Sequence, residues 1–189
     1  MSIDIQFNYD SSILDKKIDS LNREVLPNAI ARASNRTMLA ARTLSTKKIR
    51  EGYNIKSNDI KDRIEISQVF PNSTNLSSLV GSIKIKKEGI SLSKFGASQT
   101  SKGVSFRVTK KRKTIKGAFI AKMKSGFVGV FVKDGDNTKS GKKSIRPLYS
   151  TSPVDVFNSD GFREEIEKFS FEKFKSLFNE NFNYYSSKI

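Results

Sequence analysis

The sequence contains no cysteine, no histidine and no tryptophan among its 189 residues. Without Cys and His it lacks the usual ligands of zinc and the thiolate and imidazole groups on which most hydrolases depend. Disulfide bonds are excluded as well. We therefore expect no metal, no cofactor and no catalytic residues, and the composition favours a binding or structural role over an enzymatic one.

Long apolar runs are also missing. No stretch reaches the length of about 18 apolar residues that a membrane span needs, and the N-terminal MSIDIQFNYD has no basic region followed by an apolar one. These two absences predict a soluble protein that folds in a cytoplasm. Fourteen Phe and five Tyr supply enough apolar area for one sizeable core.

Acidic residues are scarce in the middle of the chain, whose overall net charge is +16. Residues 66–133 contain 14 basic side chains and a single acidic one, Glu88. The paired carboxylates of two-metal or glycosidase chemistry are therefore missing there. This excess predicts a polyanionic or acidic neighbour, either nucleic acid or an acidic protein surface. The alternative is a solvated basic face that only keeps the protein soluble.

Two groups of basic residues are candidates for contact with DNA or an acidic partner. The first lies in VTKKRKTIKGAFIAKM, where four consecutive cations precede the apolar GAFIA. The second lies on a predicted helix, where about 100° per residue places four cations on one ridge beside a stripe of small residues. The candidates are Lys110, Lys111, Arg112, Lys113 and Lys116 in the first group, and Arg32, Arg36, Lys47 and Arg50 in the second.

The periodicity of apolar residues predicts an α+β fold with N-terminal helices, a central antiparallel sheet and a C-terminal aromatic-rich helix. Helical spacing runs from Asp10 to Tyr53 with a break or restart at Pro27, and a short helix from Ser57 to Arg63 follows, with Ser57 as its N-cap. Alternation predicts strands over Leu79–Lys86, Ile90–Phe95, Val104–Val108, Thr114–Met123 and Phe127–Val132. The glycine-containing, wholly polar stretch Asp134–Ser144 predicts a loop, and an extended segment follows it.

A helix is predicted again from Phe162 onward, and it carries more aromatic residues than one packing face needs. Either this helix is buried on several sides within its own chain, or it docks onto another subunit. The docking residues would be Phe169, Phe171, Phe174, Phe178, Phe182, Tyr184 and Tyr185. We expect residues 1–157 to form a helix-plus-sheet domain and residues 158–189 to form a docking helix.

Several segments in order resemble a known family. ASNRTMLAARTL, KFGASQTSKGVSFRV, GAFIAKMKSGFVGVFVKDG and IRPLYSTSPVDVF follow the pattern of the prophage minor tail protein Z family, the lambda-type tail completion proteins of long-tailed phages. The resemblance covers about residues 33–157. It implies a structural virion protein that acts late in tail assembly, near the end of the tail that joins the head, and it brings no catalytic residues with it.

The same resemblance implies contacts with the tail terminator, the connector or the tail tube. The six-fold symmetry of such tails favours a hexamer, so we expect a homo-oligomeric ring whose basic segments contact the phosphates of packaged DNA without reading its sequence. The expected location is the tail or neck of a virion assembled in the bacterial cytoplasm, whether of a phage, a defective prophage or a gene-transfer agent. The alternative function is that of a sequence-nonspecific nucleic-acid-binding protein.

Overall fold

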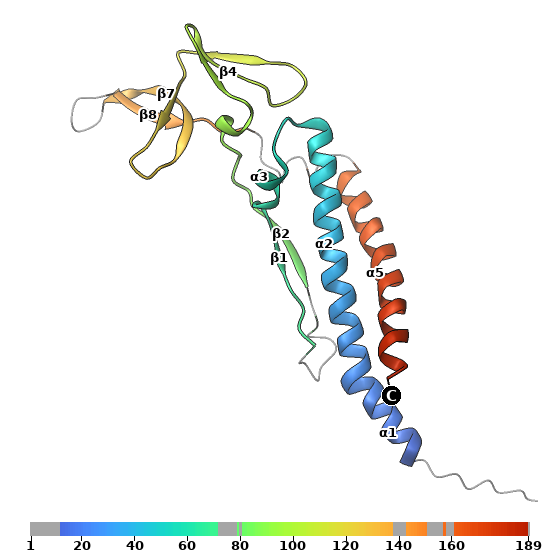
Figure 1. Cartoon of the computed structure of the whole chain (residues 1–189). Helices are drawn as coiled ribbons and strands as arrows, with labels where there is room; N and C mark the ends of the chain where they lie inside the picture. Colours follow the sequence, from blue (N-terminus) through green and yellow to red (C-terminus); the bar gives the residue numbers. More distant parts are fainter. Residues whose placement is uncertain are drawn as a thin grey trace, which may run out of the picture. The chain divides into compact units, whose positions relative to one another are not determined.

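The computed structural model describes residues 12–71, 79, 81–137, 143–150, 157 and 161–188 (Figure 1). The chain forms two compact units, each with its own apolar cluster. Unit 1 comprises Met1–Leu39, Ile66–Ser82 and Phe169–Ile189, and unit 2 comprises Ala40–Glu65 and Ile83–Lys168. Long helices and three small antiparallel sheets confirm the expected α+β class, although a single central sheet was expected.

Three helical segments follow one another without a gap: α1 (Ser12–Ser20), the π-helical segment η1 (Leu21–Val25) and α2 (Leu26–Gly52). Pro27 therefore does not break the helix, contrary to the expectation. The backbone N–H of Leu26 donates to the carbonyl of Leu21, which is an i→i−5 bond directly before the proline. Proline lacks a backbone N–H, and here this gap coincides with a place where the regular i→i−4 hydrogen bonds of the α-helix are already interrupted.

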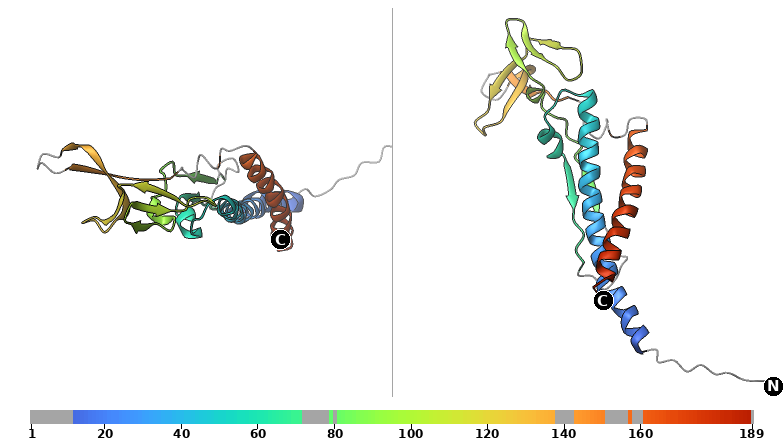
Figure 2. Two further views of the ribbon diagram at one scale, coloured as in Figure 1. Left: turned by 90° about the horizontal axis from the view of Figure 1, so that it is seen from above. Right: turned by 45° about the vertical axis from the view of Figure 1, so that its right-hand side comes forward.

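In unit 1 the first part of α2 lies beside helix α5 (Phe162–Ser186), as Figures 1 and 2 show. Ala29 and Ala33 on α2 are fully buried, because small side chains allow close packing at these positions. Leu177 and Asn181 are buried on α5. A smaller cluster in the same unit is formed by Ala31, Met38, Val69 and Leu79.

The core of unit 2 gathers apolar side chains from the end of α2, from the short helix α3 (Ser57–Lys61) and from the sheets. Its most deeply buried members are Ile60, Phe95, Val104 and Val130. Helix α5 begins within this unit, where Glu165 lies 2.8 Å from the ammonium of Lys48 on α2. This ion pair and its hydrogen bond raise the pKa of Lys48 above its ordinary value.

The strands form three separate antiparallel sheets. One pairs β1 (Ile64–Ser67) with β2 (Ser82–Ile85), and a second has the order β3 (Ser98–Thr100), β4 (Gly103–Phe106), β5 (Lys113–Lys116). The third has the order β6 (Phe119–Lys122), β7 (Val128–Asn137), β8 (Lys143–Pro147). Strands β1, β3 and β8 were not predicted as strands, because they are short or carry few apolar residues.

Two predicted strands have a different structure. Thr114–Met123 was expected to be one strand, but it is divided into β5 and β6 at Gly117, whose φ of +71° turns the chain. Ile90–Phe95 was expected to be a strand, but Leu92–Lys94 forms a 3₁₀ turn. Leu92 and Phe95 are both buried, and a spacing of three residues brings them to one side of a turn but to opposite sides of a strand.

Other boundaries also differ from the expectation. The N-cap of α3 is Lys56 in extended conformation, so the prediction of Ser57 as N-cap is wrong by one residue. The stretch predicted as a loop is shorter, because β7 continues to Asn137 and β8 begins at Lys143. Its centre, residues 138–142, lies outside the described residues. The predicted start of the C-terminal helix at Phe162 is confirmed.

Candidate nucleic-acid interface

The first group of predicted contact residues lies on and next to the edge strand β5. Lys110 and Lys111 lie in the bend between β4 and β5 and are exposed. Lys113 and Lys116 belong to β5 itself, opposite Phe106 and Gly103 of β4, and are exposed as well. These four ammonium groups are therefore exposed to solvent at the edge of the sheet, while the neighbouring strand β4 is buried along its length.

Arg112 differs from its lysine neighbours because its guanidinium is bound within the protein. Its Nη1 donates to Ser98 Oγ at 3.2 Å and to Ser105 Oγ at 3.0 Å, and its Nη2 donates to the carbonyl of Gly96 at 3.3 Å. Ser98 belongs to β3 and Ser105 to β4. The planar, five-donor guanidinium thus connects β3, β4 and the segment before β3, which a lysine ammonium does not reproduce.

The second group lies on α2 but belongs to both units. Arg32 and Arg36 are in unit 1, where they contact α5. Arg36 forms an ion pair with Glu180 at 3.2 Å, and the guanidinium of Arg32 lies 5.8 Å from the centre of the Tyr184 ring. The hydrogen bond and charge interaction with Tyr185 raise the pKa of Arg32 above its ordinary value. These two arginines therefore serve contacts within the unit.

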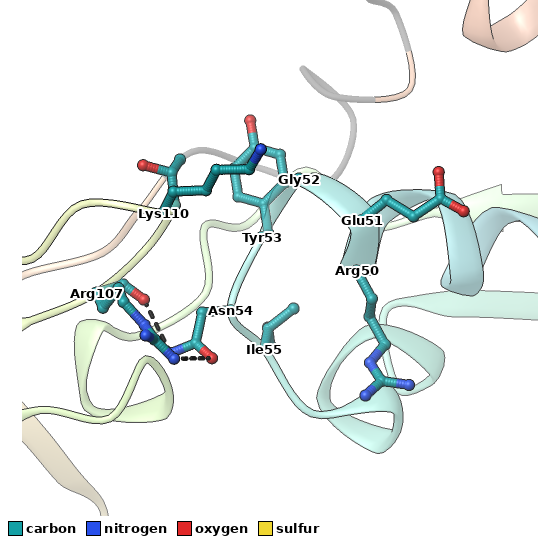
Figure 3. A pocket seen from close by; sticks show the side chains of 9 residues that line it. Arg50, Glu51, Gly52, Tyr53, Asn54, Ile55, Arg107 and Lys110 are labelled. Atoms are coloured by element: carbon teal, nitrogen blue, oxygen red, sulfur yellow. Dashed lines mark hydrogen bonds between the residues drawn. The ribbon is translucent and has the colours of Figure 1, made fainter.

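Arg50, at the end of α2 in unit 2, lines an open pocket of about 340 Å³ together with Lys110. The pocket is also lined by Arg107, which the sequence did not single out, and by the single carboxylate Glu51. In Figure 3 the guanidinium of Arg50 points away from Lys110, so the cations surround the hollow and do not converge on one point. Two predicted contact residues from distant parts of the sequence are thus brought together.

Arg107 is held in place by Asn54. Its Nη2 donates to Asn54 Oδ1 at 3.3 Å, and the Nδ2 of Asn54 donates to the carbonyl of Arg107 at 3.2 Å (Figure 3). The backbone N–H of Asn54 donates to the carbonyl of Val108 at 2.8 Å. These three bonds join the segment after α2 to the segment after β4 and fix the shape of the pocket.

A second hollow of about 370 Å³ adjoins the same helix end and is lined by Lys47, Arg50 and Lys61. The C-terminus of a helix carries partial negative charge, so cations there are favourable and are partly neutralised by it. The remaining field attracts phosphates. Ser57, the first residue of the five-residue helix α3, also lines this second hollow. The arrangement suits contact with a polyanion along its backbone and contains no element for reading base edges.

The predicted docking aromatics all lie on α5. Phe174, Phe178 and Phe182 form a stacked row with ring centres 5.9 and 5.8 Å apart, and Tyr184 and Tyr185 contact each other at 5.1 Å. Phe169 is half-buried, whereas Phe171 is the most exposed of them, at 67%. Helix α5 thus has a buried side at Leu177 and Asn181 and an exposed aromatic side chain at Phe171, and its docking onto another subunit stays a prediction.

Within the part of the chain that the structure describes, no group of three His, Cys, Asp or Glu side chains is placed to hold a metal ion. Among the same residues, no helix is both long and apolar enough to cross a bilayer.

Comparisons with known proteins give one result. The family model for the prophage minor tail protein Z (GPZ) matches residues 13–151, which include α2 and all three sheets. The match begins before Ala33, where the resemblance in the sequence was first visible, and ends before α5. No curated protein and no solved structure gives a significant match. Because the family model covers most of the chain, the protein belongs to the prophage minor tail protein Z family and is a structural component of the virion tail.

Proposed function

We propose that this tail component acts at the head-proximal end of the tail, as a completion protein needed for a functional head-tail junction and for the passage of DNA. The observation that carries the proposal is the concentration of positive charge in residues 66–133, whose 14 basic residues and one acidic residue all belong to unit 2. Two of these cations, Arg107 and Lys110, line one open pocket together with Arg50. Such a surface suits a position next to the path of packaged DNA.

A ring of identical subunits, with six favoured, would make this field continuous around the DNA. A helix such as α5 supplies the kind of surface that subunit contacts use, because Phe171 is exposed on a helix whose other side is already packed. The neighbours we propose are the tail terminator, the connector or the tail tube. Assembly would take place in the bacterial cytoplasm, before or during the joining of heads and tails.

Particles assembled without this chain test the proposed position. We expect electron microscopy to show intact heads and intact tails that fail to join, or joined particles that do not deliver DNA. Particles of normal appearance and normal infectivity would contradict the proposal. Complementation with the full-length chain is the control, since it should restore joining.

The docking role of α5 is tested separately. Phe171→Ser should reduce incorporation of the chain into tails, and truncation after Phe157 should abolish it. Phe70→Ser is the matched control, because Phe70 is exposed to a similar degree, 65%, and lies outside α5. Equal incorporation of the Phe171 and Phe70 variants would show that α5 does not dock through its exposed aromatic side.

The alternative is a sequence-nonspecific nucleic-acid-binding protein, and the exposed Lys110, Lys111 and Lys113 favour it. The isolated chain would then bind duplex DNA with a steep dependence of log K on log salt concentration. Changing these three lysines to Ala should flatten the slope by about 0.9 for each lost phosphate contact. Lys168, Lys173 and Lys175, three exposed lysines on α5, are changed to Ala as the control, because this removes the same charge. Strong DNA binding together with normal particles lacking the chain would favour this alternative.

A further inference from the structure

The two units of the chain differ in charge. Unit 1 contains 8 basic and 7 acidic residues, whereas unit 2 contains 27 basic and 12 acidic residues, a net charge of +15. Two copies that met through unit 2 would repel each other, because two surfaces with a large charge of the same sign are not complementary. Unit 1 is nearly neutral, so copies of the chain can associate through it without this repulsion.

Helix α5 carries a row of aromatic side chains within unit 1. At about 100° per residue, four of them lie within about 80° of one another. We call these residues the aromatic row: Phe171, Phe174, Phe178 and Phe182. Phe171 is 67% exposed, and the other three are half-buried and stacked on one another. Leu177 is buried next to the row, so α5 packs within its own unit on that side and leaves the other side of the row open.

The apolar side of the N-terminal helix continues beyond the part that its own unit covers. Ile18, Leu21 and Val25 follow one another at three- and four-residue spacing, which places them along one side of the helix. Val25 is buried, Leu21 is half-buried and Ile18 is 45% exposed. In Figures 1 and 2, α1 continues past the C-terminal end of α5. Helix α1 therefore has an apolar side that becomes uncovered where it extends beyond α5.

Charged residues border these two apolar surfaces in a complementary way. On the open side of the aromatic row, Lys175 lies about 40° from Phe171, and the carboxylate of Glu172 is farther away, at about 100°. On α1, Asp15 lies about 60° from Ile18 in the same rotational direction. Two antiparallel helices bring these corresponding sides together, so that Asp15 of one copy meets Lys175 of another.

The lengths of the two surfaces also agree. Helix α1 has 9 residues and is about 14 Å long, and the aromatic row extends over about 18 Å of α5. Three residues separate Asp15 from Ile18, and four separate Lys175 from Phe171. The antiparallel register that pairs Asp15 with Lys175 therefore brings Ile18 to within about 1.5 Å, along the axis, of the level of Phe171.

We propose that α1 of one copy packs antiparallel against the aromatic row of a second copy, with Ile18 over Phe171 and Asp15 paired with Lys175. The contact joins two different surfaces of the chain, so it is heterologous and closes into a ring when the rotation between copies permits. It leaves the basic residues of unit 2 uncovered. The inference rests on the ring of identical subunits proposed above, but not on the position of that ring in the tail.

Disulfide trapping tests this contact, because the chain has no cysteine of its own. Full-length chains with Ile18→Cys and tagged full-length chains with Phe171→Cys are mixed and oxidised. We expect a covalent dimer of one chain of each kind, since a disulfide forms only between cysteines whose Cα atoms lie within about 7 Å. Leu39→Cys replaces Ile18→Cys in the matched control, because Leu39 is 47% exposed and lies in unit 1 but not on α1. Equal yields with both partners, or Phe171→Cys chains linked mainly to each other, would overturn the proposal.

An exchange of charges tests the register. Sedimentation should show that Asp15→Lys and Lys175→Asp each weaken self-association about two- to fivefold, and that the double variant recovers it. Lys173→Asp is the control, because Lys173 is exposed on α5 about 200° from Phe171, and it should leave association unchanged. Recovery in the double variant cannot arise from loss of folding. A monomeric unaltered chain, or a double variant no better than the single ones, would overturn the proposal.

Photo-crosslinking in purified particles identifies the molecule that covers the aromatic row. Phe171→benzoylphenylalanine should form a cross-link to a second copy of this chain, at a peptide that contains Ile18. A cross-link to another tail protein would overturn the proposal. If this cross-link forms but particles without the chain still join to heads, the proposed position fails while the contact stands. If joining requires the chain but the cross-link goes elsewhere, the contact alone fails.

Discussion

The side-chain amide of Asn35 forms two hydrogen bonds with the backbone of Val69. Its Nδ2 donates to the Val69 carbonyl at 2.9 Å, and the Val69 N–H donates to its Oδ1, also at 2.9 Å. One side chain on α2 therefore satisfies both polar backbone groups of a residue 34 positions away in the sequence. Gln99 acts in the same way, because its Oε1 accepts from the Ile120 N–H at 2.9 Å and its Nε2 donates to the Ala118 carbonyl at 3.4 Å. Both side-chain amides thus form hydrogen bonds of the kind that the backbone of a neighbouring strand would form.

Asn35→Ala should destabilise unit 1, because it leaves both polar backbone groups of the buried Val69 without their partner. We expect a loss of about 1–3 kcal/mol. Hydrogen exchange at the Val69 N–H measures the effect locally and should become faster. Asn28→Ala, which removes an exposed bond to the Glu24 carbonyl, is the control and should change little. Unchanged exchange at Val69 would contradict the role assigned to Asn35.

Gly103→Ala should be more harmful than Gly117→Ala, although both glycines have positive φ, at +142° and +71°. At position 103 a Cβ would overlap the carbonyl oxygen of Ile115 on β5, whereas at position 117 nothing lies within 4 Å of it. The backbone strain alone costs about 1 kcal/mol or more at either site, and the overlap adds to it at Gly103. Urea unfolding measures which of the two variants is less stable, and equal stabilities would contradict the prediction.

Arg112→Lys should lower the stability of the β3–β4–β5 sheet by about 1 kcal/mol, because an ammonium does not replace the guanidinium bonds to Ser98, Ser105 and Gly96. The positive charge is retained, so the salt dependence of DNA binding should stay the same. Lys111→Arg at the exposed neighbouring position is the control. If Arg112→Lys left stability unchanged but weakened DNA binding, the guanidinium would serve the ligand rather than the sheet.

The ion pair between Lys86 and Glu65 should make stability depend on pH in the acidic range. The two groups lie 2.7 Å apart, and the hydrogen bond and charge of Lys86 lower the pKa of Glu65 below its ordinary value of 4.5. The folded protein therefore binds fewer protons than the unfolded chain near this pH. The contribution of the pair is fully present above about pH 4.5 and is lost as the pH falls through the lower pKa of the folded state.

Lys86→Gln removes the cause of this shift. The difference in stability between the unaltered chain and this variant should be small but measurable at pH 7, since the pair is exposed, and it should shrink at about pH 3. Lys87→Gln, at the exposed neighbouring residue, should show no such change with pH. A difference that grows as the pH falls would have the wrong sign for this mechanism.

Much of the architecture was predictable where local spacing and burial agree. The two long helices follow from three- and four-residue spacing, and β4 and β7 follow from alternation or continuous apolar runs. The division at Gly117 and the turn at Leu92 were missed, because an apolar run has the same appearance whether it continues straight or turns back to the core. Strand β3 has no apolar residue, and its position depends on pairing with β4.

The candidate site was predictable in its charge but not in its geometry. Lys110 and Arg50 were found from the sequence, but their approach to one pocket depends on the bonds that Asn54 makes after α2. Arg107 was missed because it stands alone between apolar residues and gives no local pattern. Its only signal was the excess of basic residues in the whole segment.

The sequence by itself determined which side chains this protein lacks, where its positive charge lies and which family it belongs to, because composition and ordered motifs do not depend on folding. Only the tertiary structure decided which basic side chains bind within the protein and which remain exposed. Arg36 pairs with Glu180, and Arg112 donates to three partners in and next to the sheet, while the adjacent Lys111 remains exposed. The reason is that a cation can pair with many different acceptors, and only the fold determines which acceptor lies within hydrogen-bonding distance.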